Sequence, residues 1–432
     1  MDKVDRFKPR LHGHRKLNIC TVVILILTSV QLMTLPVSGF CKPIRPPKAA
    51  LAKKQWVGTW GTARQLVEPN NMPPAPGLSQ STIRQIVCVS IGGKNLRLKL
   101  SNEFSKGAVT MKAVQIAVSK GGGTIDTTTI KSLTFKGNKD IRLEPGAEIY
   151  SDPISFDLKP RMEVAITIAF GETSPTLTGH PGSRTTSYLL SGEQLAPGTD
   201  FTTGVKTDHW YVITGIDVEA TGSAGAVAVF GDSITDGRGS GTNKQNRWPD
   251  VLSLNLLQDR RTQQIGVLNM GIGGNAVLRG GLGPTGLDRF QHDVLEQSGV
   301  RWLIIFEGVN DLGGTRDSLA AVNVAQGLIA AFDKMIMAAH ARGIKVYGAT
   351  IMPFKGNSYY RPYREQARNV VNDWIRSSGH FDAIIDFDQV MRDPNDPASL
   401  LTEAQAGAND HLHPNELGYQ MMGRAVSHLL FK

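Results

Sequence analysis

The periodicity of apolar residues changes once along this 432-residue chain, at about residue 220, and this change constrains the fold most. Before it, apolar and polar residues alternate with period two, as in Ile83–Val89 and Val109–Val118. After it, short apolar runs alternate with longer stretches of helical period. Because a chain of this length exceeds what one hydrophobic core usually organises, we expect two domains.

The first half predicts an all-β domain. Gly-Gly, Asn-Glu and Asp-Pro turns separate its short strands, and no helical stretch of note interrupts them. This pattern predicts an antiparallel β-sandwich of jelly-roll type over residues 55–220. Its remaining strands are expected at Leu96–Leu100, Met162–Phe170 and Trp210–Val218.

The second half, residues 224–432, predicts an α/β domain that follows a small-residue linker at 219–225. Five strands separated by helices indicate a doubly wound parallel sheet with helices on both faces. The strands are expected to begin near residues 227, 265, 302, 345 and 383. The helices are expected at 248–260, 287–297, 318–342, 361–377 and 414–430.

Ser233 is the candidate nucleophile. It follows the apolar run Val227–Phe230 and lies in a turn rich in Gly, Asp and Thr. The carboxyl ends of parallel strands form the crevice in which open α/β sheets bind ligands. A serine there becomes a nucleophile only when a base, an orienting group and oxyanion donors surround it.

His413 is the candidate base, and Asp410 is the candidate that orients it. The two lie three residues apart in a turn that Pro414 closes. This spacing lets the carboxylate hold one imidazole nitrogen while the other faces the serine.

Gly274 and Asn310 are the candidate oxyanion donors, together with the N–H of Ser233. Gly274 follows the apolar run Ile265–Leu268, and its N–H has no side chain beside it. Asn310 follows the run Trp302–Phe306, and its amide donates without carrying charge.

The chain resembles the SGNH/GDSL hydrolase superfamily in four blocks that keep the family's order. The blocks are Gly231-Asp-Ser-Ile234, Gly274 within Gly-Ile-Gly-Gly-Asn, Gly308-Val-Asn-Asp311 and Asp410-His-Leu-His-Pro414. The resemblance covers residues 224–432 and implies a flavodoxin-like α/β/α domain. It also implies Ser233, His413 and Asp410 as the catalytic residues, and an oxyanion hole of Ser233, Gly274 and Asn310. Ile234 and Asn275 depart from the commoner leucine and aspartate, and Asn275 could alter the pocket beside Gly274.

The amino terminus predicts export. Six basic residues precede an apolar run from Ile19 to Met33, and small residues follow at 37–39. We interpret residues 1–40 as a secretory signal peptide and residues 41–54 as a linker, with an uncleaved anchor as the alternative. The processed chain would be secreted, periplasmic or at the cell surface, without a stable membrane span.

Composition favours a globular chain that binds neither nucleic acid nor metal. The chain is 41% hydrophobic and 20% charged, and its formal charge of +9 falls to +5 without residues 1–39. No basic run suggests nucleic acid, and no His/Cys spacing suggests a metal site, so we expect neither metal nor cofactor. Cys41 and Cys88 could form one disulfide, although Cys88 is more typical of a buried thiol. The oligomeric state is open.

The predicted activity is ester hydrolysis through an acyl-enzyme, on an acylated extracellular polysaccharide or small esters. A lipase or lysophospholipase acting on lipid esters is the alternative within enzymes. A non-catalytic glycan-binding surface protein is the alternative of another class.

Other polar and aromatic residues of these segments have structural interpretations. We expect Asp232 and Asp311 to hold turns, and His411 to point away from the site. Trp248 is expected to pack at a helix start. Trp56 and Trp60 are expected in the core, with sugar stacking as the alternative. The loop 355–361 either lines the cleft or is solvated.

Overall fold

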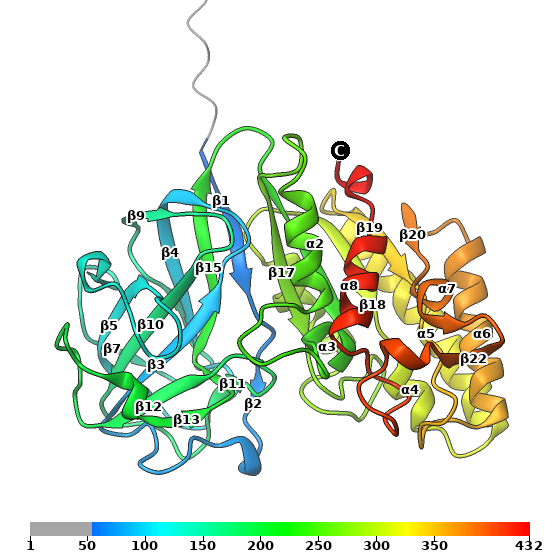
Figure 1. Cartoon of the computed structure of the whole chain (residues 1–432), viewed down its shortest axis with the longest axis horizontal. Coiled ribbons are helices and arrows are strands. Elements are labelled where there is room, and N and C mark those ends of the chain that lie inside the picture. Colours follow the sequence, from blue (N-terminus) through cyan, green and yellow to red (C-terminus); the bar gives the residue numbers. More distant parts are fainter. Residues whose placement is uncertain (1–53) are drawn as a thin grey trace, which may run out of the picture. The chain divides into compact units, whose positions relative to one another are not determined.

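The computed structural model describes residues 54–432, which belong to one compact unit of the chain (Figure 1). The predicted signal peptide, Cys41 and nearly all of the predicted linker lie outside the described residues. The unit contains a β-rich half followed by an α/β half, which confirms the predicted fold class.

Antiparallel sheets build the first half. One sheet has the order β1-β15-β4-β8 with β9 on β4, and the larger one has the order β13-β12-β3-β10-β5-β6 with β7 on β5. A small sheet, β14-β11-β2, lies beside them. The strands are β1 Gln55–Gly61, β2 Gln65–Leu66, β3 Ser81–Cys88, β4 Gly93–Ser101, β5 Val109–Val118, β6 Lys131–Ser132, β7 Ile141–Leu143, β8 Glu148–Tyr150, β9 Ile154–Leu158, β10 Glu163–Phe170, β11 Thr178–His180, β12 Ser187–Ser191, β13 Val205–Thr207, β14 Trp210–Tyr211 and β15 Ile213–Ala220.

The prediction of one strand over Trp210–Val218 is wrong, because the chain changes sheets at Val212. This residue has a φ of 57°, which no strand accommodates, and it separates β14 from β15. β14 pairs with β11, whereas β15 pairs with β1 and β4.

The linker predicted at 219–225 is shorter in the structure. β15 extends to Ala220 and β16 begins at Gly225, so only the turn at 221–224 connects the halves. The division into two domains stays a prediction, since both halves lie in one compact unit.

A five-stranded parallel sheet forms the second half, in the order β17-β16-β18-β19-β20. In chain order this is 2-1-3-4-5, the flavodoxin-like order, whose switch point lies between β16 and β18. The strands are β16 Gly225–Gly231, β17 Ile265–Gly271, β18 Val300–Phe306, β19 Lys345–Ala349 and β20 Ala383–Ile385. A hairpin of β21 (Arg392–Asp393) and β22 (Asp396–Leu400) follows.

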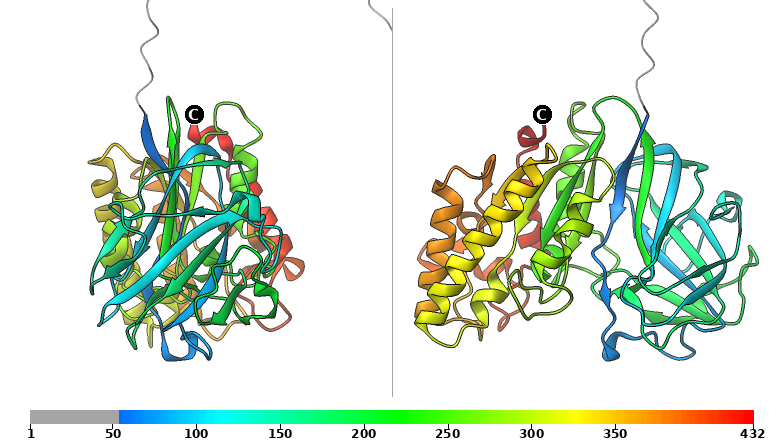
Figure 2. Two further views of the ribbon diagram at one scale, coloured as in Figure 1. Left: turned by 90° about the vertical axis from the view of Figure 1, so that its left-hand side faces the viewer. Right: turned by 180° about the vertical axis from the view of Figure 1, so that it is seen from behind.

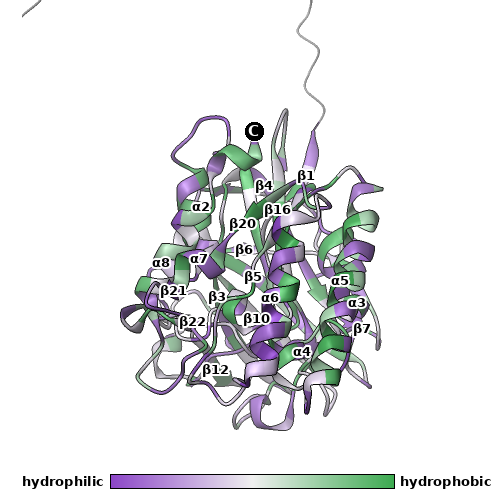
Figure 3. Ribbon diagram, turned by 90° about the vertical axis from the view of Figure 1, so that its right-hand side faces the viewer, coloured by the Kyte–Doolittle hydropathy of each residue, from purple (hydrophilic) through white to green (hydrophobic). Residues whose placement is uncertain are grey.

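Helices cover both faces of this sheet. α2 and α8 lie on one face, and α3, α5 and α6 lie on the other (Figures 2 and 3). The helices are α1 Ser233–Asp236, α2 Trp248–Leu256, α3 Gly286–Phe290, α4 Val309–Gly313, α5 Ser318–His340, α6 Pro362–Ser377, α7 Phe387–Met391 and α8 Glu416–Ala425. The short helices are η1 Pro69–Asn71, η2 Thr127–Thr129, η3 Phe201–Thr203, the π-helix η4 Gln291–Leu295, η5 Thr402–Ala404 and η6 His428–Phe431.

The predicted helices are present with different ends. The stretch predicted over 287–297 divides into α3 and η4, and the one over 414–430 divides into α8 and η6. The predictions lacked α1, α4 and α7, because four or five residues are too few to show a period of 3.6. α1 and α4 carry site residues.

α5 is long and apolar enough to cross a membrane by length and composition alone. It packs against α6 and β19 through buried side chains such as Leu328, Phe332 and Ile336. Burying a side chain of this size stabilises a fold by about 1.5–3 kcal/mol, which explains the apolar character of a helix that faces the sheet.

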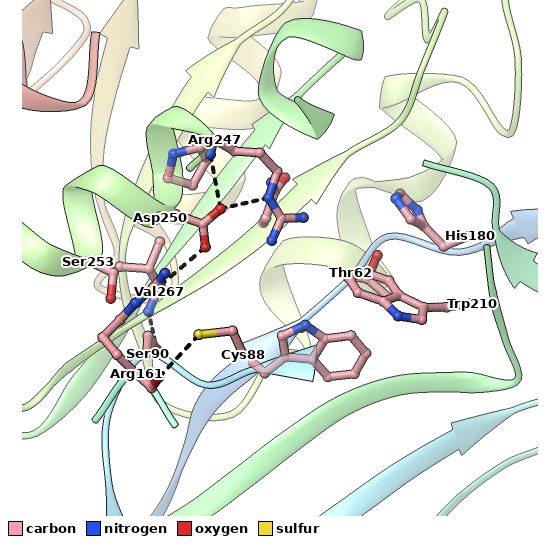
Figure 4. A pocket seen from close by; sticks show the side chains of 14 residues that line it. Thr62, Cys88, Ser90, Arg161, His180, Trp210, Arg247, Asp250, Ser253 and Val267 are labelled. Carbon is pink, nitrogen blue, oxygen red and sulfur yellow. Dashed lines mark hydrogen bonds and ion pairs between the residues drawn. The ribbon is translucent and has the colours of Figure 1, made fainter. Parts of the chain in front are cut away.

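Buried charges join the two halves (Figure 4). Arg161 of the β-rich half lies 3.2 Å from an oxygen of Asp250, whose other oxygen lies 2.7 Å from Arg247 Nε. They border a cavity of about 20 Å³, which Cys88 and Trp60 also line. Losing one member of a buried ion pair costs about 3–5 kcal/mol, so these contacts hold the β-rich half firmly against the parallel sheet.

Candidate active site

Ser233 lies where the sheet topology predicts a ligand crevice. It is the first residue of α1 and follows β16, which borders the switch point. Asp232 caps this helix by accepting a hydrogen bond from Ile234 N at 2.9 Å, which confirms its predicted role in the turn. The Ser233 N–H lies in the first turn of α1, where an N–H has no acceptor within its own helix.

His413 and Asp410 meet Ser233 from the segment that precedes α8. Ser233 Oγ lies 2.9 Å from His413 Nε2, and His413 Nδ1 lies 2.8 Å from Asp410 Oδ1. The Asp410 carboxylate can only accept a hydrogen bond, so His413 donates to it from Nδ1. The Nε2 atom of His413 then accepts a hydrogen bond from the Ser233 hydroxyl. The structure therefore brings together three predicted residues that are separated by up to 180 positions.

The electrostatics keep His413 neutral and Asp410 charged. Burial is the main cause that lowers the pKa of His413, Arg238 and Arg184 lower it further, and Asp410 opposes them. Burial opposes ionisation of Asp410, but hydrogen bonds and charge from His413 outweigh it and lower the pKa of the carboxyl group. A neutral imidazole can accept a proton from the serine.

The predicted oxyanion donors line the same cavity as the Ser233–His413 pair. Asn310, in α4, donates from Nδ2 to the Asn275 carbonyl at 2.8 Å and accepts from the Tyr359 hydroxyl at 3.0 Å. These bonds hold the amide and leave its second N–H for a ligand. Gly274 has a φ of +72°, a conformation that strains other residues. Within residues 54–432 its N–H has no acceptor.

Arg289 holds Asn275, to whose carbonyl Asn310 donates, and the sequence analysis did not identify it. This side chain is 2% exposed and donates to Asn275 Oδ1, at 2.8 Å, and to the carbonyls of Gly231 and Met270. It forms ion pairs of 3.0 Å with Asp293 and Glu307. Its pair with Asp293, four residues further on, is a spacing that surface arginines also show, and its other partners lie at or after the ends of β16, β17 and β18.

Asn275 does not line the pocket, although the sequence raised that possibility. It is fully buried and its side-chain amide donates to the carbonyls of Leu282 and Pro284. Together with the bond from Arg289, these contacts fix the backbone carbonyl to which Asn310 donates. Asn275 therefore helps to position the amide.

Buried carboxylates lie behind the nucleophile. Desolvation by burial, followed for Glu307 by repulsion from Asp232, raises the pKa values of Asp232 and Glu307. Burial also raises the pKa of Asp311. Its carboxylate accepts hydrogen bonds from the N–H groups of Val277 and Leu278, so it holds the loop after β17 and not its own turn, which differs from the prediction. Burial therefore disfavours the charged form of each of these three carboxyl groups.

The β-rich half forms one wall of the cavity, which sequence reasoning did not foresee. The cavity has a volume of about 400 Å³. Residues from the β-rich half that line it are Gln65, Glu68, Asn71, Pro181, Gly182, Arg184 and His209. The other half contributes Ser233, Asp236, Arg238, Gly273, Gly274, Leu282, Asn310, Tyr359, Leu412 and His413.

Asp236, three residues after the nucleophile, fixes this wall to α1. His180 Nε2 lies 2.9 Å from one of its oxygens and Arg184 Nη2 lies 3.2 Å from the other. Burial opposes ionisation of Asp236, but His180 and Arg184 outweigh it and lower the pKa of its carboxyl group. Asp236 therefore ties His180 and Arg184 of the β-rich half to the helix that carries Ser233.

Most of the remaining residues that the sequence analysis singled out lie away from the cavity. His411 has a φ of 52° and does not line the cavity, whereas Tyr359 of the loop 355–361 does. Trp248 is fully buried at the start of α2, Trp60 is 5% exposed, and Cys88 is buried and has no disulfide partner among residues 54–432. Trp56 stacks on the Arg97 guanidinium. In the part of the chain that the structure describes, no group of three or more His, Cys, Asp or Glu could hold a metal ion.

The flavodoxin-like sheet and the Ser233–His413–Asp410 contacts are those of a serine hydrolase domain. The family model of the GDSL-like lipase/acylhydrolase family matches residues 229–421. This part of the chain belongs to that family, which confirms the predicted resemblance. A search of curated proteins found no match.

Several solved structures are similar to this part of the chain. The lipase/acylhydrolase from Enterococcus faecalis is 18% identical with a TM-score of 0.35, covering 48% of this chain and 95% of that one. A member of the lipolytic G-D-S-L family from Veillonella parvula is 19% identical with a TM-score of 0.33, covering 47% and 96%. The acetyl xylan esterase AlAXEase is 20% identical with a TM-score of 0.33, covering 46% and 96%.

Proposed function

We propose that this protein is a serine esterase that removes acetyl or other short acyl groups from polysaccharide or small esters outside the cytoplasm. One observation carries the proposal: the Ser233 hydroxyl lies 2.9 Å from His413 Nε2 in a cavity that Gly274 and Asn310 also line. The candidate nucleophile, base and donors therefore line one cavity, in which we place the ester carbonyl. The proposed export rests on residues 1–40 of the sequence.

The reaction follows from these contacts. Ser233 Oγ attacks the ester carbonyl carbon while His413 Nε2 takes the hydroxyl proton. The negative charge on the carbonyl oxygen meets the N–H groups of Ser233, Gly274 and Asn310. His413 then returns the proton to the alcohol as its C–O bond breaks, which leaves an acyl-serine. Water repeats the cycle and releases the carboxylic acid. Asp410 orients the imidazole and stabilises its charged form.

The number of polar side chains along the cavity favours a hydroxyl-rich substrate over a lipid. Side chains with amide, carboxylate, guanidinium or imidazole groups outnumber the apolar ones, of which Leu282 is the most exposed. A long acyl chain would leave these polar groups without partners, which lowers affinity.

A panel of esters tests the proposal. The wild type should hydrolyse p-nitrophenyl acetate and acetylated xylan faster than a dioleoyl phospholipid, and it should show a burst of nitrophenol where deacylation is slow. Ser233→Ala should abolish turnover and burst. Faster cleavage of the phospholipid would support a lipase. Binding of xylan without cleavage of any ester would support the non-catalytic alternative.

A further inference from the structure

We propose that the wall from the β-rich half is a sugar subsite in which the carboxylate of Glu68 binds hydroxyl groups of the sugar that carries the acyl group. The proposal rests on the proposed esterase function and adds the residues that select the substrate. It also gives the β-rich half a role in specificity.

Glu68 is held in place before any substrate arrives. It lies between β2 and η1, and its oxygens accept hydrogen bonds from the side-chain amides of Gln65 and, at 2.9 Å, of Asn71. Gln65 is 3% exposed. The Asn71 carbonyl accepts from the Tyr211 hydroxyl at 2.8 Å, and Tyr211 is fully buried. A group fixed by buried neighbours loses little freedom on binding, as a specificity determinant requires.

The carboxylate retains capacity to bind a ligand. Each oxygen accepts one of these two hydrogen bonds and can accept a second. Within residues 54–432 no Lys, Arg or His forms an ion pair with Glu68. A half-exposed carboxylate that faces a cavity without a cation is a good acceptor for hydroxyl donors, whereas it would repel an anionic ligand.

Donors and a further acceptor line the same cavity. The Arg238 guanidinium is exposed and has no ion-pair partner in the described chain, so its N–H groups are available to a ligand. His209 donates from Nδ1 to the Pro181 carbonyl at 2.6 Å, so its Nε2 is an acceptor when the ring is neutral. A sugar hydroxyl both donates and accepts, so a sugar can satisfy both kinds of group. One free carboxylate and one free guanidinium balance in charge, which favours a neutral sugar.

The closing experiment compares two acetate esters that share the acyl group and differ in the alcohol. Acetylated methyl β-xyloside presents sugar hydroxyls, and p-nitrophenyl acetate presents none. For Glu68→Gln, the ratio of kcat/KM for the xyloside to that for the nitrophenyl ester should fall about 10- to 100-fold, the loss typical of a hydrogen bond to a charged group. Glu193→Gln, at an exposed position that does not line the cavity, is the matched control and should keep the wild-type ratio.

Binding to an inactive protein separates this proposal from the esterase proposal. Ser233→Ala should bind acetylated methyl β-xyloside measurably by calorimetry, and the further change Glu68→Gln should weaken that affinity about 10- to 100-fold. An unchanged ratio together with unchanged affinity would overturn the sugar subsite and leave the esterase proposal standing. A wild type that cleaves neither ester would refute the esterase proposal, while the binding measurement would still decide on the subsite.

Discussion

Replacement of Asn310 by alanine tests the oxyanion hole most directly. The amide donates at 2.8 Å to the Asn275 carbonyl, accepts from Tyr359 at 3.0 Å and lines the cavity beside Ser233. Removing a donor of this type typically costs about 2.7–4 kcal/mol of transition-state stabilisation, which corresponds to ~10²–10³ in kcat. The donor acts on the oxyanion more than on the ground-state carbonyl, so KM should change little.

The loss should come from the donor and not from a damaged fold. Asn310→Ala also deprives the Asn275 carbonyl of a neutral hydrogen bond, a loss of about 0.5–1.5 kcal/mol in unfolding free energy. Urea denaturation measures this loss separately. Tyr359→Phe removes only the bond that orients the amide, and should lower kcat about 3- to 10-fold.

Initial-rate kinetics on p-nitrophenyl acetate, with active-site titration of the serine, provide the measurement. A kcat for Asn310→Ala within twofold of the wild type would remove Asn310 from the oxyanion hole. A rise in KM at constant kcat would assign the amide to substrate binding instead.

Three further outcomes follow from the buried charges. The pKa of His413 lies below its ordinary value of 6.5, mainly because of burial, so the acid limb of the kcat/KM profile should lie below pH 6.5. Arg238→Gln removes a cation that lowers this pKa, so the acid limb should move to higher pH in a pH–rate profile. Burial raises the pKa of Asp232 from 3.8 to about 7, so the stability that this group contributes is present below about pH 4 and is lost as the pH rises toward 7. Asp232→Asn, which retains a capping oxygen, should reduce the fall in Tm between about pH 4 and pH 7, and an unchanged slope would contradict the raised pKa. Arg289→Met removes the cation that pairs with Asp293 and Glu307 and should lower the free energy of unfolding by about 3–5 kcal/mol in urea denaturation; a loss below about 1 kcal/mol would contradict a stabilising role for these two ion pairs.

Local patterns in the sequence were sufficient to predict the elements that carry the site. Period-two runs predicted strands such as Val109–Val118, which coincides with β5. Apolar runs followed by polar turns placed Ser233, Gly274 and Asn310 after neighbouring parallel strands, where they line one cavity. His413 and Asp410 were predicted from their spacing, because an i, i+3 pair in a turn can form its contact locally.

The strand break at Val212 was not predictable, because apolar residues continue across it. Its positive φ follows from the need of β14 and β15 to enter different sheets. Residues whose partners lie in other elements show the same limit. Arg289 meets Asn275 and Glu307 only after the strands have assembled, whereas its ion pair with Asp293 is local.

The sequence by itself determined where strands, helices and catalytic candidates lie, since these depend on neighbours a few residues away. Only the tertiary structure decided that Glu68 and Arg184 of the β-rich half share a cavity with Ser233. It also decided that Asp236 binds His180 and Arg184 beside the nucleophile. The physical reason is that a buried charge needs partners, and these come from distant parts of the chain. The periodicity of apolar residues does not show which distant residues will meet.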